Sequence, residues 1–389
     1  MSEEEELRAW VEVDLGAIVK NTRTLRRLIG DETKLLAVVK ANAYGHGSVG
    51  VARAVLYAGA DYLGVSTIDE GHKLRLGGVS APILILGYVP PPEAERVVEN
   101  RLSTAIFDAG LAEALNAAAG RLQTKAKVHI KVDTGMGRLG LYPDEVLAFY
   151  QYLEGLASLE IEGIFTHLAT ADDPDPTGVR FQLRQFNDLL AVLSAAGAQI
   201  PLVHAANSAA VLAFPESLYN MVRPGLALYG LSPRRGELVS LEPAMSLKCR
   251  VAQVRSVPAG RGISYGWAYR TLKKTNIAVL PVGYADGFSR LLSNKAKVLI
   301  REKAYPIVGK ITMDYCMADV GDDPIQEGDE AVLLGCQGRE AITADDWAEA
   351  LGTISYEVLC MIGARVPRVF INAPPDFPCL DSPKELGYR

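Results

Sequence analysis

Short apolar runs recur between residues 35 and 223, and segments with helical spacing of apolar residues separate them. Runs that are apolar at nearly every position are typical of parallel strands buried on both faces. About eight alternations of strand and helix predict a parallel (β/α)8 barrel, preceded by a strand at 10–14 and a helix at 15–29. The predicted barrel strands are 35–40, 62–66, 82–87, 103–108, 127–133, 161–167, 202–205 and 221–223, and the clearest helices are 49–56, 69–76, 109–122, 144–156 and 179–196.

The pattern changes after Pro243. Alternating apolar and polar residues, separated by Gly and Pro turns, predict a mainly antiparallel β domain with one helical insertion at 344–351. We therefore expect an α/β protein with two domains, in which residues 1–243 form the (β/α)8 barrel and residues 244–389 form the β domain. The predicted strands of the second domain are 247–254, 277–282, 296–301, 317–320 and 331–334.

The bulk composition narrows the class of protein. The chain has 389 residues, of which 49% are hydrophobic, and its net charge of -6 offers no basic excess to nucleic acid or an anionic membrane. The acidic start at 1–6 lacks the apolar core of a secretory signal, and no apolar run has membrane-spanning length. The five cysteines, which include Cys379, form no CxxC pair, and the five histidines lack metal-ligand spacing. We expect a cytoplasmic protein with reduced thiols and no metal site.

Unusual polar residues fall at or just after the ends of the predicted barrel strands. Catalytic groups of such barrels lie at that end, so a shared position at one rim predicts an active site. Lys40 is the most informative residue, because an ammonium at the end of a buried strand must be desolvated, paired or chemically modified. Such a lysine can form a Schiff base with a carbonyl cofactor. Without its neighbours in the sequence, however, the simpler interpretation is a side chain that extends its charged end into water. The candidates are Lys40, the segment 133–138, His167, Asn207, Ser208 and the segment 223–225.

The residues around Lys40 read AVVKANAYGHG, and this stretch closely resembles the pyridoxal phosphate lysine signature of the alanine racemase family. Further blocks resemble the family in the same order along the chain. They are KVDTGMGRLG at 131–140, THLA at 166–169, HAANS at 204–208, RPGL at 223–226, GISYG at 262–266, GYADG at 283–287, TMD at 312–314 and TISYE at 353–357. The resemblance implies a homodimeric enzyme that uses pyridoxal 5'-phosphate to interconvert L- and D-alanine, supplying D-alanine for peptidoglycan.

Racemisation needs a base on each face of the substrate, while pyridoxal phosphate acts as the electron sink. By the resemblance, Lys40 is one base and Tyr265 is the other. A phenol has a pKa of about 10, so it needs a nearby positive charge to act as a base near neutral pH. The family pattern places His167 beside Tyr265 and Arg223 beside His167. In the family the tyrosine reaches the barrel of the other subunit, so the resemblance implies two shared active sites.

The resemblance also implies the cofactor contacts. Arg223 is expected to face the pyridine nitrogen, where a permanent charge keeps the nitrogen unprotonated and favours racemisation over transamination. Backbone N–H groups and hydroxyls with little bulk suit the phosphate. The cofactor-binding residues implied are Lys40, Tyr44, Ser208, Arg223, Gly225, Leu226 and Tyr356.

Substrate contacts follow from the same resemblance. Arg138 is expected to bind the substrate carboxylate and the phenolic oxygen of the cofactor, because a guanidinium offers several donors in fixed geometry. Lys131 matches a lysine that is often carbamylated in the family, and the backbone at Met313 meets the substrate from the partner subunit. Tyr284 and Tyr356 match residues that narrow the entrance, which favours alanine over larger amino acids.

Other functions stay open on the sequence alone. A serine racemase or a racemase of broad specificity shares these motifs, and Tyr284 and Tyr356 argue against large substrates without deciding the matter. Arg223 and the tyrosine of the GISYG block argue against a barrel-type decarboxylase. A non-catalytic protein that binds pyridoxal phosphate usually ends after the barrel, whereas this chain continues into a β domain. An assay of both alanine enantiomers separates these classes.

Overall fold

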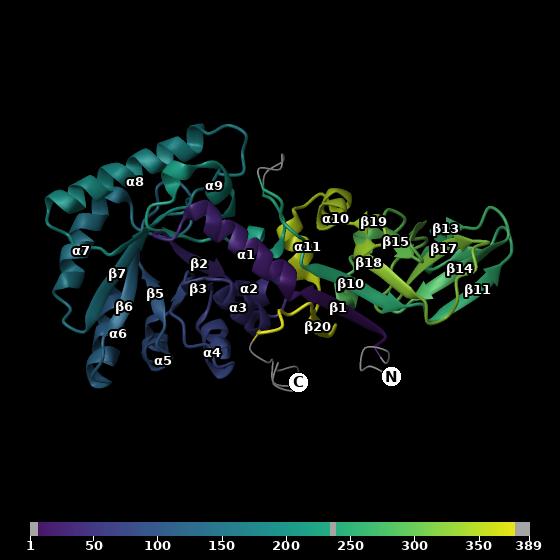
Figure 1. Ribbon diagram of the computed structural model, residues 1–389, viewed down its shortest axis with the longest axis horizontal. Coiled ribbons are helices and arrows are strands. Elements are labelled where there is room, and N and C mark those ends of the chain that lie inside the picture. Colours follow the sequence, from purple (N-terminus) through teal and green to yellow (C-terminus); the bar gives the residue numbers. More distant parts are fainter. Residues whose placement is uncertain (1–6, 234–238, 378–389) are drawn as a thin grey trace.

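The computed structural model describes residues 7–233 and 239–377 (Figure 1). The acidic start at 1–6 and Cys379, both considered above, lie outside these ranges. Helices and parallel strands occupy one end of the elongated molecule, and antiparallel strands form the other end. Within the described ranges, no helix combines the length and the apolar character that a membrane crossing requires.

Eight parallel strands close into a barrel, as the sequence predicts. Successive strands pair in parallel, and β9 pairs with β2 to complete the ring. Most strand residues are apolar and buried, which explains why each strand reads as a nearly continuous apolar run. The strands are β2 (Lys34–Val38), β3 (Tyr62–Val65), β4 (Ile83–Ile85), β5 (Ser103–Ile106), β6 (Ala126–Lys131), β7 (Leu159–Phe165), β8 (Leu202–His204) and β9 (Met221–Val222).

Helices surround the barrel and cover its outer face (Figure 1). Helix α1 begins after Asp14, whose carboxylate accepts a hydrogen bond from the Ala17 N–H, and its basic last turn suits the helix dipole. Helix α4 begins with a capping box formed by Thr67 and Glu70. The helices are α1 (Leu15–Ile29), α2 (Lys40–Tyr44), α3 (Ser48–Tyr57), α4 (Ile68–Leu76), α5 (Ala94–Glu99), α6 (Ala109–Arg121), α7 (Val146–Glu154), α8 (Thr177–Ala195) and α9 (Ser208–Ala213).

Several barrel strands end earlier than the sequence predicts. Strand β2 stops two residues before Lys40, β7 two residues before His167, and β9 one residue before Arg223. The prediction that Lys40 ends the first strand is therefore wrong, since Lys40 is the first residue of α2. The chain leaves the strand here because the backbone becomes left-handed at Ala41, and that conformation cannot continue a strand ladder. These candidate residues still follow the C-terminal ends of their strands, where barrel chemistry lies.

A mainly antiparallel part follows the barrel, as predicted. Its larger sheet has the order β16-β15-β18-β10-β1-β20, with β19 paired to β18, and a second sheet has the order β11-β14-β17. The predicted strand 247–254 is in fact divided between β10 and β11, which join different sheets. The elements are β10 (Met245–Arg250), β11 (Gln253–Val257), β12 (Gly262–Ile263), β13 (Tyr269–Arg270), β14 (Thr275–Leu280), β15 (Lys297–Ile300), β16 (Lys303–Pro306), β17 (Cys316–Gly321), β18 (Glu330–Gln337), β19 (Glu340–Ile342), α10 (Ala344–Leu351), α11 (Ser355–Met361) and β20 (Arg368–Ile371).

The first strand of the chain, β1 (Ala9–Asp14), belongs to the larger antiparallel sheet rather than to the barrel. It pairs antiparallel with β10 and parallel with β20, and α1 then leads the chain to the barrel. One buried apolar cluster includes Leu36 of the barrel and Leu247 of the sheet. Helix α11 of the second part contacts α2, so the two parts are packed together beside the turn at Lys40. A domain division at residue 243 stays a prediction.

Gly45 lies where the second part closes over the barrel rim. Its φ is +85°, and a Cβ atom added there would lie 2.5 Å from the Leu359 backbone oxygen of α11. Gly59 has a φ of +102°, but a Cβ atom added to it would have no other atom within 4 Å. We expect Gly45→Ala to lower the free energy of unfolding by more than the roughly 1–2 kcal/mol that a left-handed backbone alone costs in Gly59→Ala. Urea titration of both variants measures the difference, and equal destabilisation would show that α11 yields without strain.

Candidate active site

The turn after β2 has a left-handed backbone. Four consecutive non-glycine residues, 41–44, have φ between 51° and 55°. This conformation costs roughly 1–2 kcal/mol per residue, so the surrounding structure must hold it. The Glu70 carboxylate of α4 accepts the N–H that follows Lys40 at 2.6 Å, and the Arg368 guanidinium of β20 donates to the Gly45 carbonyl at 2.9 Å. These contacts fix the backbone position of Lys40.

Cationic side chains crowd the rim around Lys40. Burial lowers the pKa of Lys40, and the nearby Arg138 guanidinium lowers it further. Burial and the charges of Arg223 and Arg138 lower the pKa of Lys131 to about 7. The Phe165 ring partly offsets this repulsion, because its centroid lies 4.5 Å from Lys131 Nζ and 5.1 Å from Arg223 Cζ. The excess of positive charge suits anionic ligands such as a phosphate or a carboxylate.

Arg223 follows β9, and its guanidinium is buried among uncharged acceptors. Its Nη2 atom donates to the Thr166 carbonyl at 2.7 Å and to the Ala205 carbonyl at 3.1 Å, and its Nη1 atom lies 2.8 Å from His204 Nδ1. Burial lowers the pKa of Arg223 to about 9, so the side chain remains a cation at neutral pH. The structure therefore orients a charged guanidinium without neutralising it through these contacts.

His167 follows β7 and lies next to Arg223, with Nδ1 3.5 Å from Nη2 of the guanidinium. Burial and the charges of Arg223 and Lys131 lower the pKa of His167 to about 3. The histidine is therefore neutral at physiological pH and can accept a hydrogen bond from Arg223. The predicted neighbours His167 and Arg223 are thus brought together at the rim.

The Asp133 carboxylate shapes the loop that carries Arg138. Its Oδ1 accepts the N–H groups of residues 135–137 at 2.8–3.1 Å, and its Oδ2 accepts the Arg138 N–H at 3.0 Å. Burial alone would raise the pKa of Asp133, but these hydrogen bonds lower it. Gly135 and Gly137 permit the tight wrap because their φ values are +135° and +68°. The ionised carboxylate therefore holds the Arg138 backbone in place.

A cradle of three small residues, Ser208, Gly225 and Ala227, lies beside Tyr44. The Ser208 hydroxyl accepts the N–H groups of Gly225 and Ala227 at 2.8 and 3.2 Å. A Cβ atom at position 225 would lie 2.6 Å from the Tyr44 hydroxyl, so glycine is needed for that approach. The Tyr356 ring lies on another side of Tyr44, with 6.0 Å between the ring centroids. Since the Ser208 hydroxyl accepts two N–H groups, its own hydrogen is left to donate. This hydroxyl and that of Tyr44 fit the phosphate of pyridoxal phosphate, and the neighbouring cations fit its charge.

The cradle rests on a buried aromatic base. Tyr229 packs against Tyr44 at 4.9 Å and against His46 at 4.5 Å between ring centroids, and its hydroxyl donates to the Val38 carbonyl at 2.9 Å. Leu226 is buried in the same turn. The predicted phosphate-binding residues are thus brought together on one side of the rim.

Three predicted residues lie elsewhere in the molecule. Tyr265 is 69% exposed, Met313 is 53% exposed and Tyr284 is 42% exposed. Tyr265 and Met313 line one open cleft, which also includes residues of β11 and β14. Those strands lie at the end of the molecule away from the barrel (Figure 1), so a single chain does not bring Tyr265 to Lys40.

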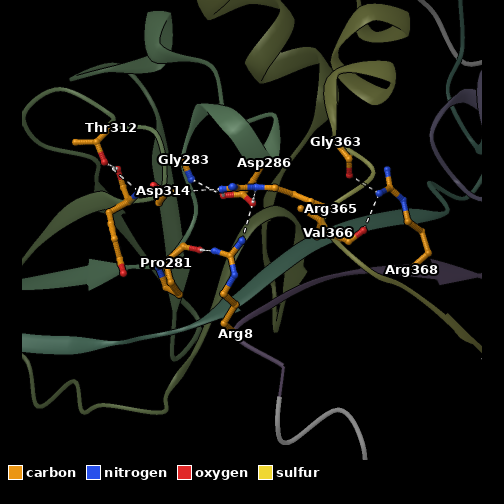
Figure 2. Close-up of polar contacts among 11 residues, drawn as sticks. Arg8, Pro281, Gly283, Asp286, Thr312, Asp314, Gly363, Arg365, Val366 and Arg368 are labelled. Atoms are coloured by element: carbon orange, nitrogen blue, oxygen red, sulfur yellow. Dashed lines mark hydrogen bonds and ion pairs between the residues drawn. The ribbon is translucent and has the colours of Figure 1, made fainter. Parts of the chain in front are cut away.

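A buried carboxylate connects two exposed turns of the second part (Figure 2). Asp286 accepts the Gly283 N–H at 2.9 Å, binds the Arg365 guanidinium at 2.7 and 3.1 Å, and binds Arg8 at 2.9 Å. Arg365 also donates to Asp314 at 2.8 Å. Arg365 therefore ties the turn that precedes Asp286, which carries Tyr284, to the turn at Asp314.

Glu70 and Arg365 also support the site, and neither is among the site residues that the sequence predicts. Glu70 has a local signal, because Thr67 and Glu70 form the T-x-x-E pattern of a capping box. Arg365 has none, since its partner Asp286 lies 79 residues away along the chain. Supports formed by distant segments can be found only once the fold is known.

A parallel barrel with Lys40, Arg223 and the cradle beside Tyr44 at its rim fits the class of barrel-type enzymes that use pyridoxal phosphate. The family described as alanine racemase, N-terminal domain, matches residues 13–233. The alanine racemase C-terminal domain matches residues 244–370. The chain belongs to the alanine racemase family.

Individual relatives agree with this assignment. The chain is 52% identical to an alanine racemase of Symbiobacterium thermophilum over 93% of this chain and 96% of that protein. It is 46% identical to an alanine racemase of Desulfovibrio desulfuricans over 93% of this chain and 98% of that protein. Among solved structures, alanine racemase of Clostridium difficile 630 matches with a TM-score of 0.91 and 39% identity, covering 94% of this chain and 96% of that one. Alanine racemase of Bacillus anthracis with bound L-Ala-P matches with a TM-score of 0.88 and 41% identity, covering 94% and 95%.

Replacing Arg365 tests whether its ion pairs fix the turn at Met313. Arg365→Met removes a contact to both Asp286 and Asp314, whereas Arg8→Met removes a partner of Asp286 and leaves Asp314 paired. Both variants should lose roughly 1–3 kcal/mol of unfolding free energy, because each leaves a buried carboxylate partly unpaired. Only Arg365→Met should raise KM for the substrate several-fold. Chemical unfolding and steady-state kinetics measure the two effects, and an equal rise of KM in both variants would contradict this role.

Proposed function

We propose that this protein interconverts L- and D-alanine with pyridoxal 5'-phosphate bound at the barrel rim. The observation that carries the proposal is the cationic rim, where Lys40, Arg138 and Arg223 converge in a chain of the alanine racemase family. When bound, the cofactor withdraws electrons from the substrate and so makes its α-proton more acidic. The residues of this chain then have to bind the substrate, orient it and move protons.

Lys40 is the proposed base on one face of the substrate. Burial and the charge of Arg138 lower its pKa, so its amine is free to accept a proton more often than that of an exposed lysine. The left-handed turn and its contact with Glu70 limit the positions that Nζ can reach. Arg138, whose backbone is held by Asp133, is proposed to bind the substrate carboxylate through paired N–H donors.

Tyr265 is the proposed base on the opposite face, acting in the barrel of a second subunit. Its exposure and that of Met313 support this arrangement, because both line a cleft that a second copy of the chain can cover. The proposal therefore requires a homodimer. It also requires that the barrel, which lies within residues 1–243, supplies Lys40, and that the second part, which lies within residues 244–389, supplies Tyr265.

Arg223 is proposed to face the pyridine nitrogen of the cofactor. Its cation has uncharged hydrogen-bond partners, so it would present a permanent positive charge to that nitrogen and would keep the nitrogen unprotonated. A cation at that position would leave more of the negative charge on the α-carbon of the substrate, which would favour return of the proton to that atom over transamination. His167 and Arg223 are proposed to help the Tyr265 phenol act as a base. The proposed phosphate contacts are Tyr44, Ser208, Gly225, Leu226 and Tyr356.

A small substrate is favoured at this site. Tyr284 and Tyr356 are proposed to narrow the entrance, which would exclude side chains much larger than methyl. The solved alanine racemase of Bacillus anthracis holds L-Ala-P, which supports an alanine-sized ligand for its relative described here. We propose that the enzyme works in the cytoplasm and supplies D-alanine for peptidoglycan.

A coupled assay of the purified holoenzyme with L- and D-alanine tests the activity, and serine is the comparison substrate. We expect interconversion of alanine in both directions and much slower turnover of serine. If the cofactor is bound to Lys40 but neither alanine enantiomer is converted, the protein only binds the cofactor and the proposal is refuted. Comparable rates with serine would instead support a racemase of broad specificity.

Mixing two impaired variants tests whether the active sites are shared. Tyr265→Phe and Lys40→Ala should each lose most of the activity, because each lacks one base. If Tyr265 acts across subunits, a mixed dimer contains one site in which both bases are native. Coexpression should then restore up to about one quarter of the wild-type activity, since about half of the dimers are mixed and each has one intact site. Failure to recover activity, with mixed dimers detected by native mass spectrometry, would contradict the shared site.

Lys131 should become carbamylated when bicarbonate is present. The neutral amine is the form that attacks carbon dioxide, and burial with the charges of Arg223 and Arg138 lowers the pKa of Lys131 to about 7. The reactive fraction therefore rises as the pH increases through that value. Lys127 serves as the control, because its hydrogen bond to Glu162 raises its pKa and keeps it charged. Carbon-13 NMR in labelled bicarbonate should give a carbamate signal that grows above about pH 7, disappears in Lys131→Ala and persists in Lys127→Ala; its survival in Lys131→Ala would contradict the assignment.

A further inference from the structure

A line of buried polar side chains runs through the barrel interior behind Arg223. His204 Nδ1 lies 2.8 Å from Arg223 Nη1, and His204 Nε2 lies 2.8 Å from His129 Nδ1. His129 Nε2 then lies 3.0 Å from a carboxylate oxygen of Glu162. His129, Glu162 and His204 come from the adjacent strands β6, β7 and β8, and all three are buried. The mechanism proposed above assigns no task to these three residues.

The donors and acceptors in this line allow one arrangement of protons. An arginine N–H can only donate, so His204 Nδ1 must accept. Burial lowers the pKa of both histidines, and at His129 it outweighs the opposite effect of the hydrogen bond to Glu162. The contacts also require neutral rings, because a charged His129 would point an N–H group from Nδ1 at the N–H group of His204. A neutral His204 then carries its proton on Nε2 and donates it to His129 Nδ1. His129 in turn carries its proton on Nε2 and donates it to Glu162.

Glu162 fixes the far end of this line. Its carboxylate also accepts from the Ser103 hydroxyl at 2.8 Å, from the Lys127 ammonium at 2.8 Å and from the Tyr62 hydroxyl at 3.4 Å. Burial alone would raise the pKa of Glu162, but hydrogen bonds from His129 and Lys127 lower it to about 2. Each of these neighbours has a hydrogen to donate, so an ionised carboxylate satisfies all of them where an amide cannot.

We infer that Glu162 is a positioning residue for Arg223 and acts through His129 and His204. The carboxylate sets the tautomer of each histidine, so that His204 Nδ1 always offers a lone pair to Arg223 Nη1. This hydrogen bond keeps the guanidinium in its orientation at the rim. If an amide N–H group took the place of the carboxylate, the line would have a donor at each end, Arg223 at one and the amide at the other. One of the hydrogen bonds between them would then be lost. This inference rests on the proposed role of Arg223 towards the cofactor, whereas the tautomers themselves can be measured without substrate.

Glu160 provides a matched control for Glu162. It lies on the same strand, β7, and its carboxylate is 3.7 Å from the Nζ atom of the same Lys127. Its side chain is 46% exposed, whereas that of Glu162 is 6% exposed and contacts His129. Glu160→Gln therefore removes a charge beside Lys127 and leaves the histidine line intact.

Nitrogen-15 NMR of histidine-labelled holoenzyme reads the tautomers directly, because the chain has only five histidines. In the wild-type protein we expect His129 and His204 to be neutral, each with its proton on Nε2. Finding either histidine charged, or with its proton on Nδ1, would overturn the inference without any variant. Because no substrate is needed, this measurement tests the tautomers even if the protein does not racemise alanine. A failure of the proposed function can therefore be distinguished from a failure of this inference.

Glu162→Gln should disturb both the tautomers and the reaction. We expect a mixture of tautomers at His129 and a kcat reduced roughly ten- to hundredfold, the range that loss of a hydrogen bond to a charged group implies, with KM little changed. The absorbance spectrum of the bound cofactor should also shift, because Arg223 is held less firmly. Glu160→Gln should keep wild-type values in every measurement. Equal effects in the two variants, or a loss of stability in Glu162→Gln with unchanged tautomers and kcat, would show that Glu162 has a structural role only.

Discussion

Like charges held together at the barrel rim are the constraint on which the rest of the structure depends. Lys40, Lys131 and Arg138 lie close enough for their charges to lower the pKa of their neighbours. Several features relieve this repulsion: the lowered pKa of Lys131, the Phe165 ring and the backbone carbonyls around Arg223. None of these brings a carboxylate to the guanidinium. An excess of positive charge therefore remains at the rim, and it suits an anionic ligand such as the phosphate of pyridoxal phosphate.

The same rim is also where the two parts of the chain meet. Helix α11 carries Tyr356, which packs on Tyr44, and its Leu359 carbonyl lies close to Gly45. Arg368 of β20 donates to the Gly45 carbonyl of the same left-handed turn. The second part thus contributes to the site of its own chain. It supports the strained turn that sets the backbone of the lysine, so the barrel and the sheets act on the site together.

The barrel could be predicted from the sequence because strands buried on both faces leave a local apolar pattern. The left-handed turn at 41–44 could not, since alanine and tyrosine give no local signal for positive φ, and a single asparagine does not predict four consecutive left-handed residues. The pairing of β1 with β10 and β20 escaped prediction for a different reason, because contacts between distant segments leave no periodicity. Within the site, the rim position revealed Lys40 and Arg223, whereas His129 and Glu162 read only as polar interruptions of strands. Their partners become evident once neighbouring strands are placed side by side.

The placement of Glu162 separates two tasks that a single ion pair would combine. A carboxylate touching Arg223 would orient the guanidinium, but it would also cancel much of the charge that the rim presents to its ligand. A neutral imidazole offers a lone pair without a charge, so His204 can orient Arg223 while the field at the rim stays positive. The carboxylate that fixes the tautomers lies beyond a second imidazole, and Lys127 balances its charge at that end. Hydrogen bonds through the barrel interior thus set the orientation of Arg223, and Lys127 balances the charge of Glu162 at the end of the line away from the rim.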